Sequence, residues 1–109
     1  MLRVLDRETI DEAARRLLEA APDGSRVILF GSYARGEADP RSDLDFLVVE
    51  PQVKDPYSEM VRLREAMRPL DLFADVLVVS DEGFDKWRDS PSTVIYDVAR
   101  EGKVYERVS

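Results

Sequence analysis

Apolar residues recur every three or four positions in three stretches of the chain, which is the spacing of an amphipathic helix. The first stretch, 6–21, carries a stripe of six: Ile10, Ala13, Ala14, Leu17, Leu18 and Ala21. The second predicts a helix over about 55–68, with Met60, Leu63, Met67 and Leu70. The third opens at Ser90-Pro91 and carries Val94, Ile95, Val98 and Ala99. A fourth, shorter helix is expected over 80–87.

The ends of these helices have ordinary capping and stop signals. Asp6 or Thr9 is a suitable N-cap for the first helix, and Ser80 or Asp81 for the short one. The stop signals are proline and glycine residues, namely Pro22-Asp23-Gly24, Pro69 and Gly102. The helix boundaries are therefore predicted as well as the helices.

Apolar runs between the helices predict strands. The runs are RVILF at 26–30, DLDFLVV at 43–49, and 72–79, while 103–108 alternates like an edge strand. Glu50-Pro51 closes the second run. Between the first two runs, residues 32–35 are expected to start a short helix that ends in an exposed loop at 36–42.

The resulting order of elements is α-β-α-β-α-β-α-α-β. It predicts one α/β domain over residues 1–109, with a small mixed sheet of three to four strands flanked by helices. A chain of 109 residues is long enough for one core and too short for two full domains.

Composition narrows the chemistry available to this domain. The chain has no Cys and no His, which excludes disulfides, zinc sites of the usual ligand types and histidine acid/base catalysis. Its net charge of −7 argues against general binding to nucleic-acid phosphates. Neither a signal peptide nor a membrane-spanning apolar run is recognisable, so a cytoplasmic protein is expected.

Acidic residues interrupt two of the predicted strands. Asp43 and Asp45 are two positions apart, so their carboxylates project from the same face, and Asp75 interrupts the third run. If the two strands are neighbours, three carboxylates meet in one patch that suits a hard divalent cation such as Mg²⁺. The alternatives are that Asp43 is a turn carboxylate and that Asp75 pairs with Arg64 or Arg68.

Gly31-Ser32 follows the first predicted strand directly. Glycine lets the backbone approach an anion closely, and free N–H groups at the start of a helix, with the serine hydroxyl, can hold phosphate. Arg35 is a candidate phosphate contact. The alternatives are a plain turn and helix cap at Gly31-Ser32 and a solvated surface position for Arg35.

The segment GSYARGEADPRSDLDFLVV, residues 31–49, resembles the signature of the nucleotidyltransferase superfamily typified by DNA polymerase β. The matching features are Gly31-Ser32, ten intervening residues, Asp43-x-Asp45, and a third acid, Asp75, on a later strand. The short chain and the closing AREGKVYER are similar to the minimal nucleotidyltransferases. The resemblance implies the palm-like fold of that superfamily.

The resemblance also implies a reaction, the transfer of a nucleoside monophosphate from a nucleoside triphosphate, ATP in the first instance, to a hydroxyl. Asp43 and Asp45 would bind two Mg²⁺ ions, with Mn²⁺ as an alternative, and Asp75 would complete the metal site. Gly31, Ser32 and Arg35 would hold the triphosphate.

Minimal nucleotidyltransferases resemble antitoxins that pair with an all-helical HEPN-type toxin. The leading hypothesis is therefore an adenylyltransferase that modifies a tyrosine of such a partner. The alternatives are a non-catalytic antitoxin of the same fold and a small-molecule nucleotidyltransferase whose acceptor pocket forms in a homodimer. The apolar stripe at Val94, Ile95 and Val98 either completes the core or meets a partner.

Overall fold

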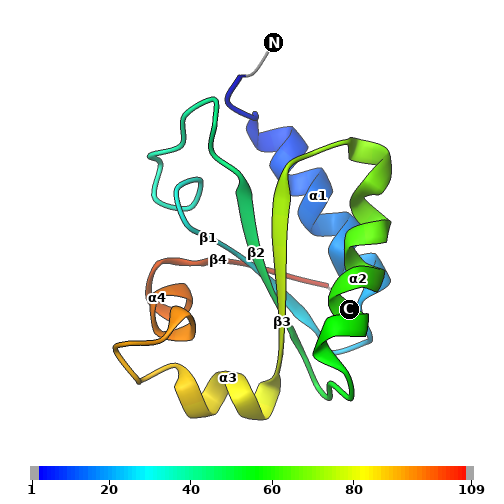
Figure 1. The fold of residues 1–109 in the computed structure, drawn as a ribbon, viewed down its shortest axis with the longest axis vertical. Coiled ribbons are helices and arrows are strands. Elements are labelled where there is room, and N and C mark those ends of the chain that lie inside the picture. The colour runs from blue at the N-terminus through cyan, green and yellow to red at the C-terminus, as the bar shows by residue number, and fades with distance from the viewer. Residues whose placement is uncertain (1–2, 108–109) are drawn as a thin grey trace.

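The computed structural model describes residues 3–107 and contains the helices and strands in the predicted order, except for the short helix expected at 32–35 (Figure 1). The helices are α1 (Arg7–Ala20), α2 (Pro56–Met67), the 3-10 turn η1 (Arg68–Leu70), α3 (Asp81–Trp87) and α4 (Val94–Glu101). The strands are β1 (Arg26–Phe30), β2 (Leu44–Glu50), β3 (Ala74–Ser80) and β4 (Lys103–Glu106). None of the helices in the described range has the length and apolar character needed to cross a bilayer.

The four strands form one mixed sheet in the order β3-β2-β1-β4. β1 pairs antiparallel with both β2 and β4, whereas β2 and β3 run parallel. The parallel pair is joined through α2, which is the usual way for a chain to return to the same edge of a sheet. The α/β prediction with a sheet of three to four strands is confirmed.

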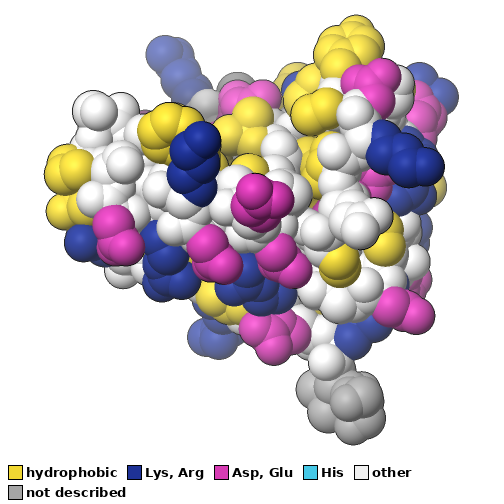
Figure 2. Space-filling view, turned by 90° about the horizontal axis from the view of Figure 1, so that it is seen from below, with side chains coloured by type: hydrophobic (Ala, Val, Ile, Leu, Met, Phe, Trp, Pro, Cys, Tyr) yellow, Lys and Arg dark blue, Asp and Glu magenta, His cyan; other side chains and the backbone are white. Residues whose placement is uncertain are grey.

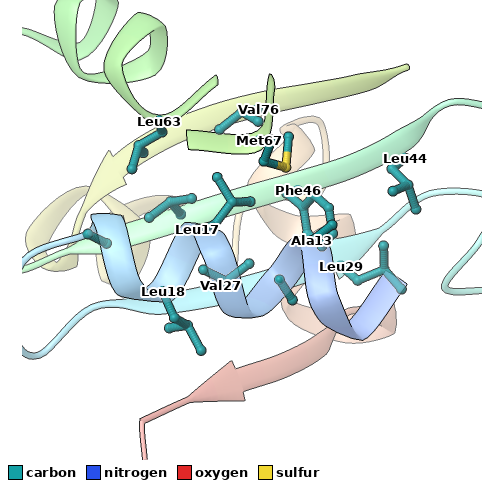
Figure 3. Close-up of a cluster of buried hydrophobic side chains, with 13 residues drawn as sticks. Ala13, Leu17, Leu18, Val27, Leu29, Leu44, Phe46, Leu63, Met67 and Val76 are labelled. Atoms are coloured by element: carbon teal, nitrogen blue, oxygen red, sulfur yellow. The ribbon is translucent and has the colours of Figure 1, made fainter. Parts of the chain in front are cut away.

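Helices cover both faces of the sheet (Figure 1). Side chains alternate along β2, so one set packs against α1 and α2 and the other against α3 and α4. The first set belongs to the larger core, in which Leu17, Phe46 and Leu63 are fully buried (Figure 3). The second core is smaller and contains Ile28, Leu47, Val49, Phe84 and Val98. The predicted alternation along β2 is therefore confirmed.

Two predicted helix starts are wrong. Residues 32–36 form successive turns instead of a helix, because Gly36 has a φ of +72° and the Glu37 N–H closes the turn onto the Ser32 carbonyl at 2.9 Å. The last helix begins at Val94 and not at Ser90-Pro91. Thr93 takes over as N-cap, and its hydroxyl accepts the Tyr96 N–H at 3.2 Å.

Smaller differences concern the strand ends. Asp43 and Leu72 lie before their strands rather than in them, since β2 starts at Leu44 and β3 at Ala74. Asp71 has a left-handed φ of 50°, and this turn delays the start of β3. The final strand ends at Glu106, and the predicted end at Val108 lies outside the described residues.

Candidate active site

The parallel pairing of β2 and β3 brings two of the predicted acids together. Asp45 lies directly beside Asp75 in the register, so their side chains leave the same face of neighbouring strands that are about 4.8 Å apart. Asp43 is exposed and sits one residue before β2. The condition on which the carboxylate prediction depended, that the two strands are neighbours, is therefore met.

Gly31 places the backbone of the following turn against Asp45. Its φ of +78° lies in the left-handed region, which disfavours any side chain. A Cβ atom at this position would also overlap Oδ2 of Asp45. Two independent constraints thus require glycine here: the left-handed backbone and the close approach of the turn to the Asp45 carboxylate.

The electrostatics of Asp45 show that the acids influence one another. Burial raises the pKa of the Asp45 carboxyl above its usual value, and the charges of Asp75 and then Asp43 raise it further. The guanidinium of Arg35 acts in the opposite direction and less strongly. The negative charge at this end of β2 is therefore only partly balanced within the chain.

The two arginines near these acids do not neutralise them fully: one is paired with other carboxylates and the other lies at long range. Arg64 Nη2 lies 3.7 Å from Asp75 Oδ1, so one of the alternative partners expected for Asp75 is present, at long range and at the surface. Arg35 pairs with Glu37 at 2.7 Å and with Glu101 of α4 at 3.1 Å. The Arg35 guanidinium is thus held between two carboxylates, and its role as a phosphate contact remains a prediction.

The donor set fits a hard divalent cation. Mg²⁺ prefers oxygen ligands and usually takes one or two carboxylates, with waters and substrate phosphates completing its shell. Asp45 and Asp75 offer such carboxylates side by side, with Asp43 close by. Among the described residues no group of three or more Asp, Glu, His or Cys side chains is placed to hold a metal ion. Metal binding by Asp43, Asp45 and Asp75 together therefore stays a prediction, in which waters and phosphates would complete the shell.

The phosphate-binding prediction at Gly31-Ser32 changes in form. The N–H groups of Ala34 and Arg35 both point to the Gly31 carbonyl, at 3.1 Å each, so the segment is a tight turn and not the N-terminus of a helix. A helix dipole is therefore not available to an anion here. What the turn offers is close backbone approach beside Asp45 and the Ser32 hydroxyl.

A family model described as a nucleotidyltransferase domain matches residues 10–72, more than half of the chain. The chain belongs to this family. The matched segment contains Gly31, Ser32, Asp43 and Asp45, and Asp75 lies just beyond it. A curated relative, the bifunctional uridylyltransferase/uridylyl-removing enzyme of Bordetella pertussis, is 42% identical over 48 residues. Those residues are 42% of this chain but only 6% of that much longer enzyme.

Solved structures share the fold. A putative nucleotidyltransferase from Sulfolobus solfataricus has a TM-score of 0.63 at 20% identity, over 92% of this chain and 79% of that one. A toxin–antitoxin structure with AMP-PNP has a TM-score of 0.63 at 22% identity, over 94% and 75%. A toxin–antitoxin MntA–HpeT mutant gives 0.56 at 21% identity, over 94% and 75%. The architecture is therefore that of a nucleotidyltransferase domain.

The sequence did not single out the surface next to these acids. Trp87, at the end of α3, is 43% exposed. The stripe on α4 divides, with Val98 buried and Val94 52% exposed. The sequence did contain one signal for this surface: the apolar stripe of α4 is wider than the part of the helix that the core buries.

Proposed function

We propose that this chain is a Mg²⁺-dependent nucleotidyltransferase that moves AMP from ATP to a hydroxyl of a partner protein, namely a tyrosine of an all-helical HEPN-type toxin, and so acts as an antitoxin. The observation that carries this proposal is the in-register pairing of Asp45 with Asp75 beside the turn at Gly31. Family membership supports the transfer reaction. The toxin–antitoxin structures of the same fold, one of them with AMP-PNP, support the partner.

In this proposal each predicted residue has a role. Asp43 and Asp45 hold two Mg²⁺ ions and Asp75 completes the site on the acceptor side. Ser32 and the backbone at Gly31 hold the β- and γ-phosphates. When bound, Mg²⁺ neutralises the charge on the attacking and leaving oxygens of an in-line displacement. Such catalysis consists of positioning and charge neutralisation, so the absence of histidine from the chain is no obstacle.

The proposed reaction is a balanced displacement at phosphorus. The acceptor oxygen forms a bond to the α-phosphorus while the bond from that phosphorus to the α–β bridging oxygen breaks. Pyrophosphate leaves with the electron pair, and the hydroxyl proton passes to solvent. The products are an AMP ester of the acceptor and pyrophosphate.

The test is the release of pyrophosphate from ATP and Mg²⁺ in the presence of the acceptor protein. Asp43→Ala should lower the rate by at least about 100-fold, because a metal-binding carboxylate is lost where the charge develops. Asp43 is exposed and precedes β2, so the fold should survive, as checked by circular dichroism. Asp89→Ala removes an exposed aspartate elsewhere and should leave the rate unchanged.

A second candidate is a non-catalytic antitoxin that works by covering its partner. Two findings favour it: Asp75 pairs with Arg64 at 3.7 Å, and no three acids among the described residues are placed to hold a metal ion. The two candidates separate in cells. If the Asp43→Ala chain protects cells from the toxin as well as the unmodified chain does, covering the partner is the mechanism and catalysis is not.

The remaining parts of the proposal concern setting. Residues 1–109 are taken to act as one domain in the cytoplasm. A small-molecule nucleotidyltransferase that forms its acceptor pocket by homodimerisation is the third candidate. It predicts pyrophosphate release when a small molecule that carries a hydroxyl replaces the partner protein, so this exchange in the same assay distinguishes it.

A further inference from the structure

An ion pair joins the turn after β1 to the end of α4. Arg35 Nη1 donates to Oε1 of Glu101 at 3.1 Å, across 66 residues of sequence. On its other side, Arg35 Nε donates to Oε1 of Glu37 at 2.7 Å. The turn and α4 lie on the same side of the molecule in Figure 1, where the turn is cyan and α4 is orange. One guanidinium therefore lies between a carboxylate of its own turn and a carboxylate of a distant helix.

The end of α4 is fixed in place by Gly102, which directly follows Glu101. A Cβ atom at Gly102 would overlap Cγ2 of Ile28 on β1, so the end of the helix packs directly against the strand. The Gly102 N–H also closes the helix onto the Val98 carbonyl at 2.9 Å, and Val98 is buried in the smaller core. The carboxylate of Glu101 thus extends from a well-packed point beside the strand that leads into the turn.

Neutralisation of Arg35 does not explain why two carboxylates hold it, because Glu37 alone balances one positive charge. Pairs of exposed charged side chains are ordinary on this protein, and Figure 2 shows acidic and basic side chains side by side on the surface seen from below. Such pairs contribute little to stability. The second carboxylate instead adds orientation. A guanidinium is planar and holds its N–H donors in a fixed fork, so acceptors at both Nε and Nη1 determine how the group is turned.

The oriented guanidinium lies near the candidate active site. Its charge opposes the rise in the pKa of Asp45, so it is within electrostatic range of that carboxylate. Asp45 shares its face of the sheet with Leu47, which packs in the same core as Val98 of α4. The acid and the end of α4 are therefore on the same side of the sheet. Among the described residues, Nη2 of Arg35 donates to no acceptor, so this nitrogen is available to a ligand.

We propose that Glu101 is a positioning residue, which holds the Arg35 guanidinium so that Nη2 meets the β- and γ-phosphates of a nucleotide bound at the turn. This inference rests on the proposed function and adds a residue of α4 to its nucleotide site. Glu101 does not touch the nucleotide. It acts through Arg35, whose long side chain would otherwise have to be ordered when the nucleotide binds. Hydrogen bonds from arginine to phosphate are charge-assisted and therefore strong, so their geometry affects affinity.

The sign of the effect separates positioning from general electrostatics. Removing Glu101 takes a negative charge away from the neighbourhood of an anionic ligand, so Coulomb forces alone predict tighter binding of ATP. Loss of positioning predicts weaker binding, because the guanidinium is no longer held in the binding orientation. The two explanations therefore predict opposite changes in the Kd of ATP.

Calorimetry measures the Kd of ATP with Mg²⁺ in the absence of any acceptor, so that no transfer takes place. Glu101→Ala should raise this Kd about three- to tenfold, part of the effect of one charge-assisted hydrogen bond. Glu101→Gln should stay within about twofold of the unmodified chain, because the amide oxygen still accepts from Nη1. The matched control is Asp97→Asn, which removes an equal charge from an exposed position on α4 and should not raise the Kd.

A double-mutant cycle tests whether Glu101 acts through Arg35. Arg35→Ala should raise the Kd of ATP about tenfold or more, and adding Glu101→Ala to that variant should raise the Kd no further. The side chains of Arg35 and Glu101 are 44% and 30% exposed, so losing the pair should cost little stability. Circular dichroism and the melting temperature without ligand should therefore be close to those of the unmodified chain for every variant.

The other outcomes are also decisive. If the unmodified chain binds ATP but Glu101→Ala leaves the Kd unchanged or lowers it, the positioning role is overturned and the proposed function stands. The same conclusion follows if Arg35→Ala leaves the Kd unchanged, or if Glu101→Ala weakens binding equally in the Arg35→Ala chain, because Glu101 then does not act through Arg35. If the unmodified chain binds no ATP with Mg²⁺, the nucleotide site of the proposed function fails and the inference fails with it.

Discussion

Strand β2 carries a half-buried carboxyl group near its start and a buried one at its end, and the two groups have different neighbours. Asp45 lies on the face covered by α3 and α4, while Glu50, five residues on, lies on the face covered by α1 and α2. Burial is the largest cause that raises the pKa of both groups, and the pKa of Glu50 is raised to about 8. Burial thus acts on two acids that have different neighbours.

At the Glu50 end the neighbours complete a structural pair. Glu50 is 2% exposed, and after burial the neighbouring carboxyl of Glu59 on α2 is the next cause that raises its pKa. Glu59 in turn accepts two hydrogen bonds from Arg62, at 2.9 and 2.7 Å. In its protonated form Glu50 can donate to Glu59, whose charge is balanced by arginine, although Oε2 of Glu50 has no hydrogen-bond partner among the described residues. This network fixes α2 to the end of the sheet.

At the Asp45 end the nearest charged groups are further carboxylates, and the arginines in reach are distant or shared with other acids. Charge that the fold leaves unbalanced is available to a ligand. The difference between the ends teaches that a raised pKa alone does not mark a functional acid. A functional acid is better indicated when, among the described residues, no side chain close by neutralises its charge.

The largest expected effect concerns pH and Glu50. Because the pKa of Glu50 is raised to about 8 in the folded chain, the folded state holds one more proton than the unfolded state between about pH 5 and pH 8. Stability should therefore fall as the pH rises through this window, by up to about 1.4 kcal/mol per pH unit. In Glu50→Gln the amide N–H can replace the donated proton, so most of the slope should be lost, and the smaller part due to the raised pKa of Asp45 should remain.

Urea unfolding from pH 5 to pH 8.5 measures this slope. Glu106→Gln, which removes the same charge from an exposed position on β4, is the control and should keep the slope of the unmodified chain. A slope that persists at full size in Glu50→Gln would mean that another group causes it and that the Glu50–Glu59 pair is ionised. The two ends of β2 would then no longer differ as described.

Much of the fold was predictable because local signals agreed. Asp6 and Ser80 cap α1 and α3 as predicted, and the apolar stripe of α1 is the stripe that the larger core buries. The strand order was not predictable, since it depends on which strand edges meet once the helices pack. The helix predicted at residues 32–35 is wrong because Gly36 takes a φ of +72° and the Glu37 N–H closes onto the Ser32 carbonyl.

The candidate site was predictable in composition but not in its electrostatics. Spacing placed Asp43 and Asp45 on one face, yet the pairing with Asp75 required knowledge that β2 and β3 are neighbours. Glu50 was interpreted only as part of the end of its strand. Its buried partner, Glu59, lies on the helix that packs back on the sheet, and no local pattern connects the two residues.

The next effect in size is stabilisation by metal and nucleotide. Millimolar Mg²⁺ with ATP should raise the melting temperature, because a ligand at about ten times its Kd adds about 1.4 kcal/mol, or roughly 5 °C for a domain of this size. Asp45→Asn should lose this shift and Glu50→Gln should keep it, as calorimetry can measure. If Glu50→Gln abolishes the shift instead, the ligand binds at the end of β2 that we describe as structural.

The smallest effect concerns the metal-free chain. Asp45→Asn should raise the free energy of unfolding by about 0.5–1 kcal/mol at pH 7 in the presence of a chelator, because it keeps the shape of the side chain and removes its repulsion with Asp75 and Asp43. The chain has a net charge of −7, so the loss of any negative charge relieves some general repulsion. Asp85→Asn, at an exposed position on α3, measures that general part and should give the smaller gain.

The gain in the free energy of unfolding of Asp45→Asn, compared with that of Asp85→Asn, tests whether the two ends of β2 differ. If Asp45→Asn gains no more than Asp85→Asn, then Arg64 and Arg35 already balance the acids, and the Asp45 end is as complete within the chain as the Glu50 end. If it gains more, the fold tolerates a local repulsion that it could have avoided with a single amide. Repulsion among Asp45, Asp75 and Asp43 that a bound cation would remove is then the physical reason to assign Asp45 a functional role and Glu50 a structural one.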